Sequence, residues 1–156
     1  MHYSQTRTET FQPDGRTRLL SYAWLPEGEI KAVFIAIHGA LTHAGDWVTP
    51  ALFFKDRGVA TYAFDLRWHG TYPQYNPGGK VFFHTESYDQ SAADVHAFYG
   101  FVTDKHPDKP IFVIGHSMGA GGAASLATAR ADRIAAAVCI AGGPLFPPRT
   151  PCAPLL

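Results

Sequence analysis

Five residues late in the chain, Gly115 to Gly119, read Gly-His-Ser-Met-Gly and match the pattern G-x-S-x-G. They follow an apolar run typical of a buried strand and precede a segment rich in alanine and glycine. In this pattern the serine occupies a sharp turn between strand and helix, where its hydroxyl is exposed for attack. Glycine flanks the serine because such a strained turn leaves no room for a Cβ atom. These residue types therefore indicate nucleophilic acyl transfer by Ser117.

The elements that would position Ser117 alternate between strands and helices. Apolar runs predict buried parallel strands over residues 32–37, 59–64, 110–114 and 134–140. Helices are predicted between them, one starting at Pro50 after the N-cap Thr49, one over 88–102 and one over 119–130. The turn Pro13-Asp14-Gly15 predicts a hairpin before these elements. The order predicts an α/β fold with a mostly parallel, doubly wound sheet of about six strands.

Composition limits the kinds of partner that the chain is expected to have. Its 156 residues suit a single domain, and its formal net charge of zero argues against nucleic acid or an anionic membrane surface as partner. No apolar stretch approaches the roughly 18 residues that a membrane span needs, so no stable membrane insertion is expected. Two cysteines outside any disulfide framework, and a polar N-terminus without signal-peptide character, predict a cytoplasmic location.

Two further motifs precede the serine motif, each directly after a predicted strand. They are His38-Gly39-Ala40 and the run from Asp65 to Gly70, which reads Asp-Leu-Arg-Trp-His-Gly. In this order and spacing, the three motifs resemble the α/β-hydrolase superfamily, most closely its monoacylglycerol lipase and lysophospholipase-like branch, also labelled serine aminopeptidase-like. The resemblance runs from about residue 8 to residue 143, and Trp68 and Ala120 stand where that branch commonly has glycine.

The resemblance implies a role for each motif. Ser117 would be the nucleophile, and the backbone N–H groups of Met118 and Ala40 would form the oxyanion hole. The other motif residues would shape the loops around the site: His38, Gly39, Asp65, His69, Gly70, Gly115, His116 and Gly119. The implied activity is hydrolysis of carboxylic esters, of monoacylglycerol or lysophospholipid type or of small acyl esters, without a cofactor or a metal ion.

The proton-handling residues of such an enzyme are not found at the expected place. A serine hydroxyl needs a base that a third group orients, and in this fold the acid and then the histidine follow the serine. After Ser117 the chain has one acid, Asp132, which is predicted to be a solvated loop charge, and no histidine. Loss of the base of a serine triad lowers kcat by about 10⁶. The chain is therefore expected to be a C-terminally truncated hydrolase that is inactive or very weak by itself.

The domain is expected to cover residues 1–143. Residues 144–156 contain five prolines and no periodic pattern, so this tail is expected to be extended or disordered. Without the rest of the sheet, the strand over 134–140 would be an uncovered apolar edge, which predicts self-association.

Two classes of function stay open. In the first, the chain belongs to an ester hydrolase whose missing residues lie in a longer parent or come from another chain. In the second, it is a catalytically incomplete fragment or a protein that binds acyl ligands.

Residues 119–124 also match a dinucleotide-binding pattern, but the match begins inside a helix and no acid follows at the usual distance. Histidine pairs such as His38 with His43 stand in no metal-binding frame.

Overall fold

The structure is a computed structural model, and it describes residues 6–70 and 87–142. The proline-rich tail expected at 144–156, and the domain boundary expected at residue 143, lie outside the described residues. Within the two described ranges, strands and helices alternate in the order that the sequence predicts.

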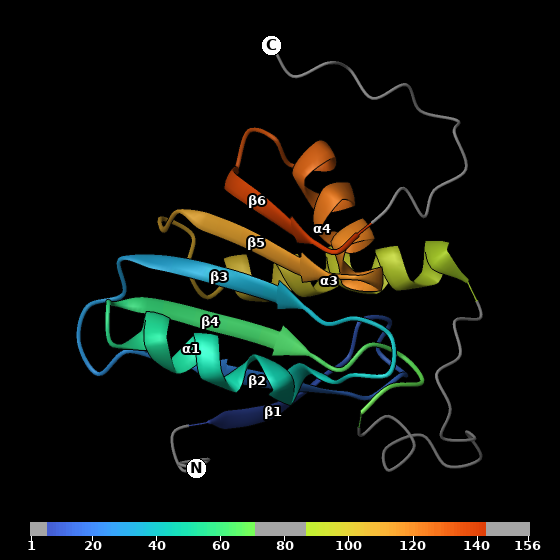
Figure 1. Cartoon of the computed structure of the whole chain (residues 1–156), viewed down its shortest axis with the longest axis horizontal. Coiled ribbons are helices and arrows are strands. Elements are labelled where there is room, and N and C mark those ends of the chain that lie inside the picture. The colour runs from blue at the N-terminus through green and yellow to red at the C-terminus, as the bar shows by residue number, and fades with distance from the viewer. Residues whose placement is uncertain (1–5, 71–86, 143–156) are drawn as a thin grey trace.

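The described strands form one six-stranded sheet in the order β1-β2-β4-β3-β5-β6 (Figure 1). Four neighbouring strands, β4, β3, β5 and β6, run parallel, whereas β2 is antiparallel to both β1 and β4. The strands are β1 (Arg7–Phe11), β2 (Leu19–Trp24), β3 (Ala32–Ile37), β4 (Val59–Phe64), β5 (Ile111–His116) and β6 (Ile134–Ile140). The prediction of a mostly parallel α/β sheet is confirmed.

Helices cover both faces of the sheet (Figure 1). They are α1 (Val48–Lys55), which a 3-10 turn η2 (Ala44–Trp47) precedes, α3 (Tyr88–Thr103) and α4 (Met118–Ala129). Helix α1 packs over β2 and β4, and α4 packs over β5 and β6 on the opposite face, beside α3. The larger apolar core lies under α3 and α4 and includes Val95, Phe98 and Leu126. A smaller core under α1 includes Trp24 and Ala51.

Helix α1 begins at Val48, two residues before the predicted start at Pro50. The turn η2 leads directly into the helix, so Trp47 rather than Thr49 is the N-cap residue. Pro50 is tolerated inside the first turn because the first four N–H groups of a helix have no intrahelical acceptor. The missing N–H of proline therefore costs no helical hydrogen bond at this position.

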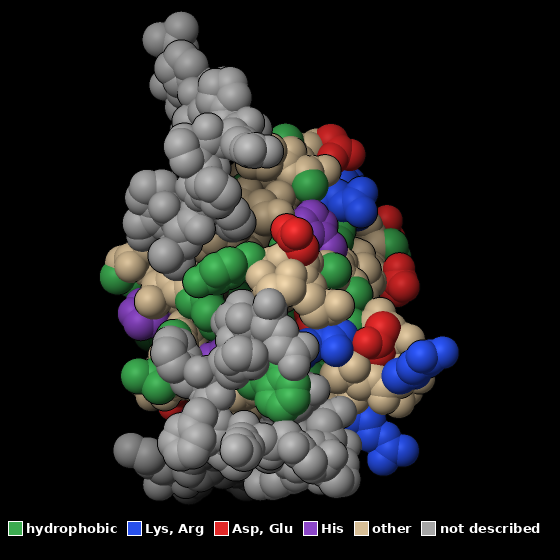
Figure 2. Space-filling view, turned by 90° about the vertical axis from the view of Figure 1, so that its right-hand side faces the viewer, with side chains coloured by type: hydrophobic (Ala, Val, Ile, Leu, Met, Phe, Trp, Pro, Cys, Tyr) green, Lys and Arg blue, Asp and Glu red, His purple; other side chains and the backbone are tan. Residues whose placement is uncertain are grey.

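The carboxyl ends of β3, β4 and β5 lie at one edge of the sheet, on the right of Figure 1. Each of the three sequence motifs lies at the carboxyl end of one of these strands, so the parallel topology brings the motifs together. Figure 2 looks onto this side, where hydrophobic side chains gather near the middle and charged side chains lie mainly toward one border. In open parallel sheets, ligands bind outside the carboxyl ends of the strands.

Candidate active site

Ser117 lies at the junction of β5 and α4, as the N-cap residue of the helix. Its backbone has φ 53° and ψ −117°, a combination that a residue with a Cβ atom adopts only under strain. Its N–H donates to the carbonyl of Ile140 at 2.8 Å, and its carbonyl accepts from the N–H of Ala120 at 3.0 Å. The serine thus occupies a strained turn between strand and helix, the geometry that the G-x-S-x-G pattern is associated with.

Gly115 and Gly119 allow the backbones around this turn to approach closely. A Cβ atom on Gly115 would lie 2.5 Å from the carbonyl carbon of Gly119 and 2.8 Å from the Cα of Ala120. A Cβ atom on Gly119 would lie 2.5 Å from the carbonyl oxygen of His38, which belongs to the loop after β3. Both approaches involve backbone atoms, which cannot turn aside, so any side chain at these positions would force the segments apart.

Gly39 is the point at which the loop after β3 meets the serine. A Cβ atom on Gly39 would lie 3.0 Å from the Cβ of Ser117 and 3.0 Å from the Nδ1 of His116. Ala40 follows directly, and Met118 is the first residue of α4. The structure therefore brings together the two segments whose amides the family resemblance assigns to an oxyanion hole.

His38 is buried and joins the loop after β3 to the loop after β4. Its Nε2 accepts a hydrogen bond from the backbone N–H of Leu66 at 2.9 Å, and its Nδ1 lies 2.7 Å from the carbonyl oxygen of Gly39. An amide N–H can only donate, so Nε2 carries no proton and Nδ1–H donates to Gly39. Burial lowers the pKa of His38 from 6.5 to about 4, and this ring is therefore neutral near pH 7.

Asp65 and His69 stabilise the loop after β4. The buried carboxylate of Asp65 accepts from the backbone N–H of Ala44 at 2.9 Å, which ties this loop to the turn before α1. The buried His69 ring donates from Nδ1 to the carbonyl of Arg67 at 2.7 Å. Gly70 has φ +53°, and a Cβ atom there would lie 2.8 Å from Oδ1 of Asp65. These residues hold the loop in shape, and none of these contacts reaches Ser117.

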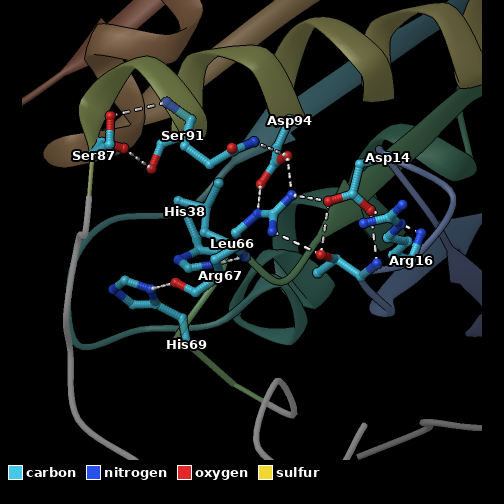
Figure 3. A network of polar contacts seen from close by, with 11 residues as sticks. Asp14, Arg16, His38, Leu66, Arg67, His69, Ser87, Ser91 and Asp94 are labelled. Carbon is cyan, nitrogen blue, oxygen red and sulfur yellow. Dashed lines mark hydrogen bonds and ion pairs between the residues drawn. The ribbon is translucent and has the colours of Figure 1, made fainter. Parts of the chain in front are cut away.

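Arg67 connects three distant segments through one guanidinium group (Figure 3). It forms a bidentate pair with the buried Asp94 on α3, at 2.5 and 2.9 Å, and it donates to Asp14 at 2.9 Å and to Thr17 at 2.7 Å in the first hairpin. These carboxylates raise the pKa of Arg67. Hydrogen bonds from the Thr17 backbone and then from Arg67 lower the pKa of Asp14. The loop after β4 is thereby fixed to both α3 and the hairpin.

Arg67 lies within a sequence motif, but the sequence indicates no partner for it and does not mark Asp94 as a site residue. One signal could have found Asp94, which lies four residues before the apolar Phe98 and therefore on the same side of α3, a side that the structure buries. An acid on such a face requires a cationic or hydrogen-bonding partner. The sequence does not reveal that this partner comes from residue 67, since the contact depends on the tertiary fold.

Neither Asp132 nor His96 is placed to serve Ser117. Asp132 is exposed in the turn that precedes β6, whereas the end of β6 contacts Ser117. A strand of this length separates the two by roughly 20 Å. His96 on α3 does contact a serine, but that residue is Ser125, at 3.0 Å. Ser125 lies roughly 12 Å along α4 from Ser117.

An apolar hollow opens beside the first turn of α4. Its lining includes Ile37, Leu66, Tyr88, Val95, Met118 and Gly122. The residue after Ser117 is therefore part of its wall, which places an apolar surface directly next to the strained turn.

Within residues 6–70 and 87–142, no helix is both long enough and apolar enough to cross a bilayer. The same ranges contain no group of three or more His, Cys, Asp or Glu side chains arranged to hold a metal ion.

Known structures share the fold. A carboxyl esterase from Bacillus coagulans superposes with a TM-score of 0.74 at 23% identity, covering 86% of this chain and 43% of that one. An esterase from Pyrococcus furiosus superposes with a TM-score of 0.65 at 25% identity, covering 88% of this chain and 51% of that one. The topology is therefore that of part of an α/β-hydrolase.

Several sequence relatives are lipases. The chain is 34% identical over 119 residues to a monoacylglycerol lipase of Mycolicibacterium smegmatis, covering 76% of this chain and 40% of that protein. It is 31% identical over 116 residues to the monoglyceride lipase of Mus musculus, covering 74% of this chain and 35% of that protein. The chain thus spans less than half the length of these relatives. The family model for serine aminopeptidase S33 matches residues 28–155. Together with the fold, this match shows that the chain belongs to the serine aminopeptidase S33 family of α/β-hydrolases.

Proposed function

We propose that this chain carries the nucleophile and the oxyanion hole of a carboxylic ester hydrolase. The single observation that supports this most strongly is the backbone of Ser117, held at φ 53° and ψ −117° beside Gly39. Strain of this kind persists only where the surrounding structure maintains it, and it is concentrated at functional sites. The lipases among the sequence relatives favour the same class of reaction.

In the proposed reaction, the Oγ of Ser117 attacks the carbonyl carbon of the ester. A bond forms between Oγ and that carbon, the C=O electron pair moves to the oxygen, and a base takes the hydroxyl proton. The N–H groups of Ala40 and Met118 would stabilise the resulting negative charge. One such donor lowers the barrier by roughly 2.7–4 kcal/mol. Met118 lies at the N-terminus of α4, where the helix dipole adds positive potential.

The apolar hollow beside Met118, about 30 Å³ in volume, would receive the first carbons of an acyl group next to the reacting carbonyl. Its wall is mostly apolar and includes Ile37, Val95 and Gly122. Burial of apolar surface contributes roughly 0.8 kcal/mol per CH₂ group. We therefore assign monoacylglycerol-like, lysophospholipid-like or small acyl esters as the substrate class.

The base is the missing part of this proposal. No histidine follows Ser117 in the sequence. Among the earlier ones, His38 uses both ring nitrogens in hydrogen bonds, and His96 contacts Ser125. The 156 residues by themselves would therefore have a kcat about 10⁶-fold lower than an enzyme with a complete triad. The second candidate function is binding of an acyl ligand without turnover, for which the apolar hollow beside Met118 would be the site.

A fluorophosphonate probe tests the proposal, because it modifies serines in such sites covalently. We expect slow labelling of the wild-type chain that Ser117→Ala abolishes and Ser125→Ala does not change. Ser125 is a matched control, since it is a serine on the same helix that already contacts a histidine. Labelling that is absent, or that survives in Ser117→Ala, would refute the assignment of Ser117.

The second candidate function is separated by a binding assay with a fluorescent long-chain acyl ligand. Binding without any Ser117-dependent labelling would favour an acyl-binding protein.

The cytoplasmic location stays a prediction and is tested by fractionating cells that produce the chain.

A further inference from the structure

The peptide unit between Gly39 and Ala40 is held from one side by two side chains. The carbonyl oxygen of Gly39 accepts from Nδ1–H of His38 at 2.7 Å and from the hydroxyl of Thr42 at 2.8 Å. A carbonyl oxygen has two lone pairs, and these two donors occupy both. Since His38 is buried, its hydrogen bond is also shielded from water.

The same peptide unit carries the amide that the proposed oxyanion hole needs. The structure has no cis peptide bonds in its described part, so the C=O of Gly39 and the N–H of Ala40 point in opposite directions across one plane. Fixing the oxygen therefore fixes the direction of the N–H. If this peptide plane rotated by half a turn, the N–H of Ala40 would point away from the Ser117 side, and the carbonyl oxygen of Gly39 would take its place.

We propose that His38 and Thr42 are positioning residues that hold the Gly39–Ala40 peptide with the N–H of Ala40 directed to the Ser117 side of the loop. This inference rests on the proposed function, because it concerns an amide of the proposed oxyanion hole. The close approach of Gly39 to the Cβ of Ser117 places the peptide next to the reacting residue. The two side chains act through the peptide and do not touch the substrate.

The position of His38 is in turn fixed from the loop after β4. Its Nε2 accepts from the N–H of Leu66, and the next residue, Arg67, is anchored to Asp94 and Asp14. The orientation of one amide beside Ser117 thus depends on a chain of hydrogen bonds that reaches the first hairpin and α3 (Figure 3). This arrangement gives the buried histidine a defined task, although it is not a base.

The test uses the full chain and the substitution Thr42→Val, which removes one of the two donors while keeping the shape of the side chain. Thr42→Ser retains the hydroxyl and should behave like the wild type. Thr103→Val is the matched control, because the hydroxyl of Thr103 donates to backbone carbonyls at 3.0 and 3.1 Å on α3, away from the loop after β3. Thermal melting of each variant shows whether the fold is retained.

The first readout is labelling of Ser117 by the fluorophosphonate, separated into its maximal rate and the probe concentration that gives half of that rate. We expect Thr42→Val to lower the maximal rate by roughly 10- to 100-fold, since misplaced groups lose rate rather than affinity. The half-saturating concentration should stay unchanged. Thr42→Ser and Thr103→Val should label like the wild type. An unchanged maximal rate in a folded Thr42→Val chain would overturn the proposal.

The second readout does not require reactivity. Nitrogen-15 NMR of the wild type should show His38 as the neutral Nδ1–H tautomer, and the amide signal of Ala40 should shift or broaden in Thr42→Val but not in Thr103→Val. The Nε2–H tautomer, or an unaltered Ala40 signal, would overturn the inference. If the wild type fails to label while these NMR results hold, the proposed function fails and the positioning of the peptide stands.

Discussion

The two amides assigned to the oxyanion hole are held in place by different means. Around Ala40, the buried His38 and Asp65 join the loops after β3 and β4, and the Arg67–Asp94 pair fixes the second of these loops to α3. Around Met118, the elements β5 and α4 carry no buried charge and instead meet through Gly115 and Gly119. Hydrogen bonds position a backbone group where segments are distant in sequence. Close backbone packing does so where a strand turns directly into a helix.

The loops around Ala40, held by buried polar groups, form the polar side of the site. The largest effect on stability is expected when the buried carboxylate of this polar side, Asp94, is removed. Asp94→Ala would leave the Arg67 guanidinium without its bidentate partner, which costs about 3–5 kcal/mol of stability when the pair is buried. Chemical denaturation measures this difference. Asp132→Ala, which removes an exposed turn charge, should change stability by less than about 0.5 kcal/mol. Similar small losses for both variants would show that the pair does not anchor the loop.

Acid should weaken the same polar side through His38. Burial lowers its folded pKa to about 4, and His69, Asp65 and His43 are the titratable groups that influence it. Because the folded state disfavours the charged ring, this contribution is complete above pH 6.5 and is lost as the pH falls through 4. The loss amounts to about 3 kcal/mol by linkage. Denaturation of the wild type and of His38→Asn between pH 7 and 4 should give a shallower pH dependence for the variant. Equal slopes would contradict this assignment.

The close backbone packing around Met118 forms the steric side of the site, and adding one methyl group there tests it. Gly119→Ala places a Cβ atom 2.5 Å from the carbonyl oxygen of His38, so we expect a loss of about 1–3 kcal/mol and a displaced turn at Ser117. Gly100→Ala is the matched control, since no atom lies within 4 Å of its added Cβ. In that helix interior, the change should stabilise by about 0.5–1 kcal/mol. Stabilisation by both substitutions would show that close packing does not position the turn.

The steric side also ends in an edge strand without charges. Strand β6 is exposed, with Val138 at 46% and Ile140 at 41%, whereas the opposite edge β1 carries Arg7 and Glu9, the latter paired with Lys105. Charged edge strands resist pairing with other chains and uncharged apolar ones favour it. We therefore infer that two copies of the chain associate through β6.

This association should show as a concentration-dependent increase in mass in analytical ultracentrifugation. Val138→Lys is expected to shift the equilibrium to the monomer, with a stability change within about 0.5 kcal/mol because the residue is exposed. Thr8→Lys on β1 should leave the equilibrium unchanged. A wild-type chain that stays monomeric at all concentrations would show that this edge does not self-associate.

The sequence allowed much of the steric side to be predicted and little of the polar side. The apolar runs and the small residues around Ser117 are local patterns, and they predicted β5, α4 and the turn between them. The pairing of Arg67 with Asp94 and Asp14 joins positions 27 and 53 residues apart, so no local pattern contains it. The start of α1 at Val48 was missed for a related reason, because the preceding turn η2 extends the helix beyond its proline signal.

The central claim is that Ser117 lies between two amides that can stabilise an oxyanion. A crystal structure of the chain after modification of Ser117 by a phosphonate tests it most directly. The account predicts a phosphonyl oxygen roughly 2.7–3.1 Å from both the Ala40 and the Met118 backbone nitrogens. An adduct whose oxygens face solvent, or contact only one of these nitrogens, would contradict it.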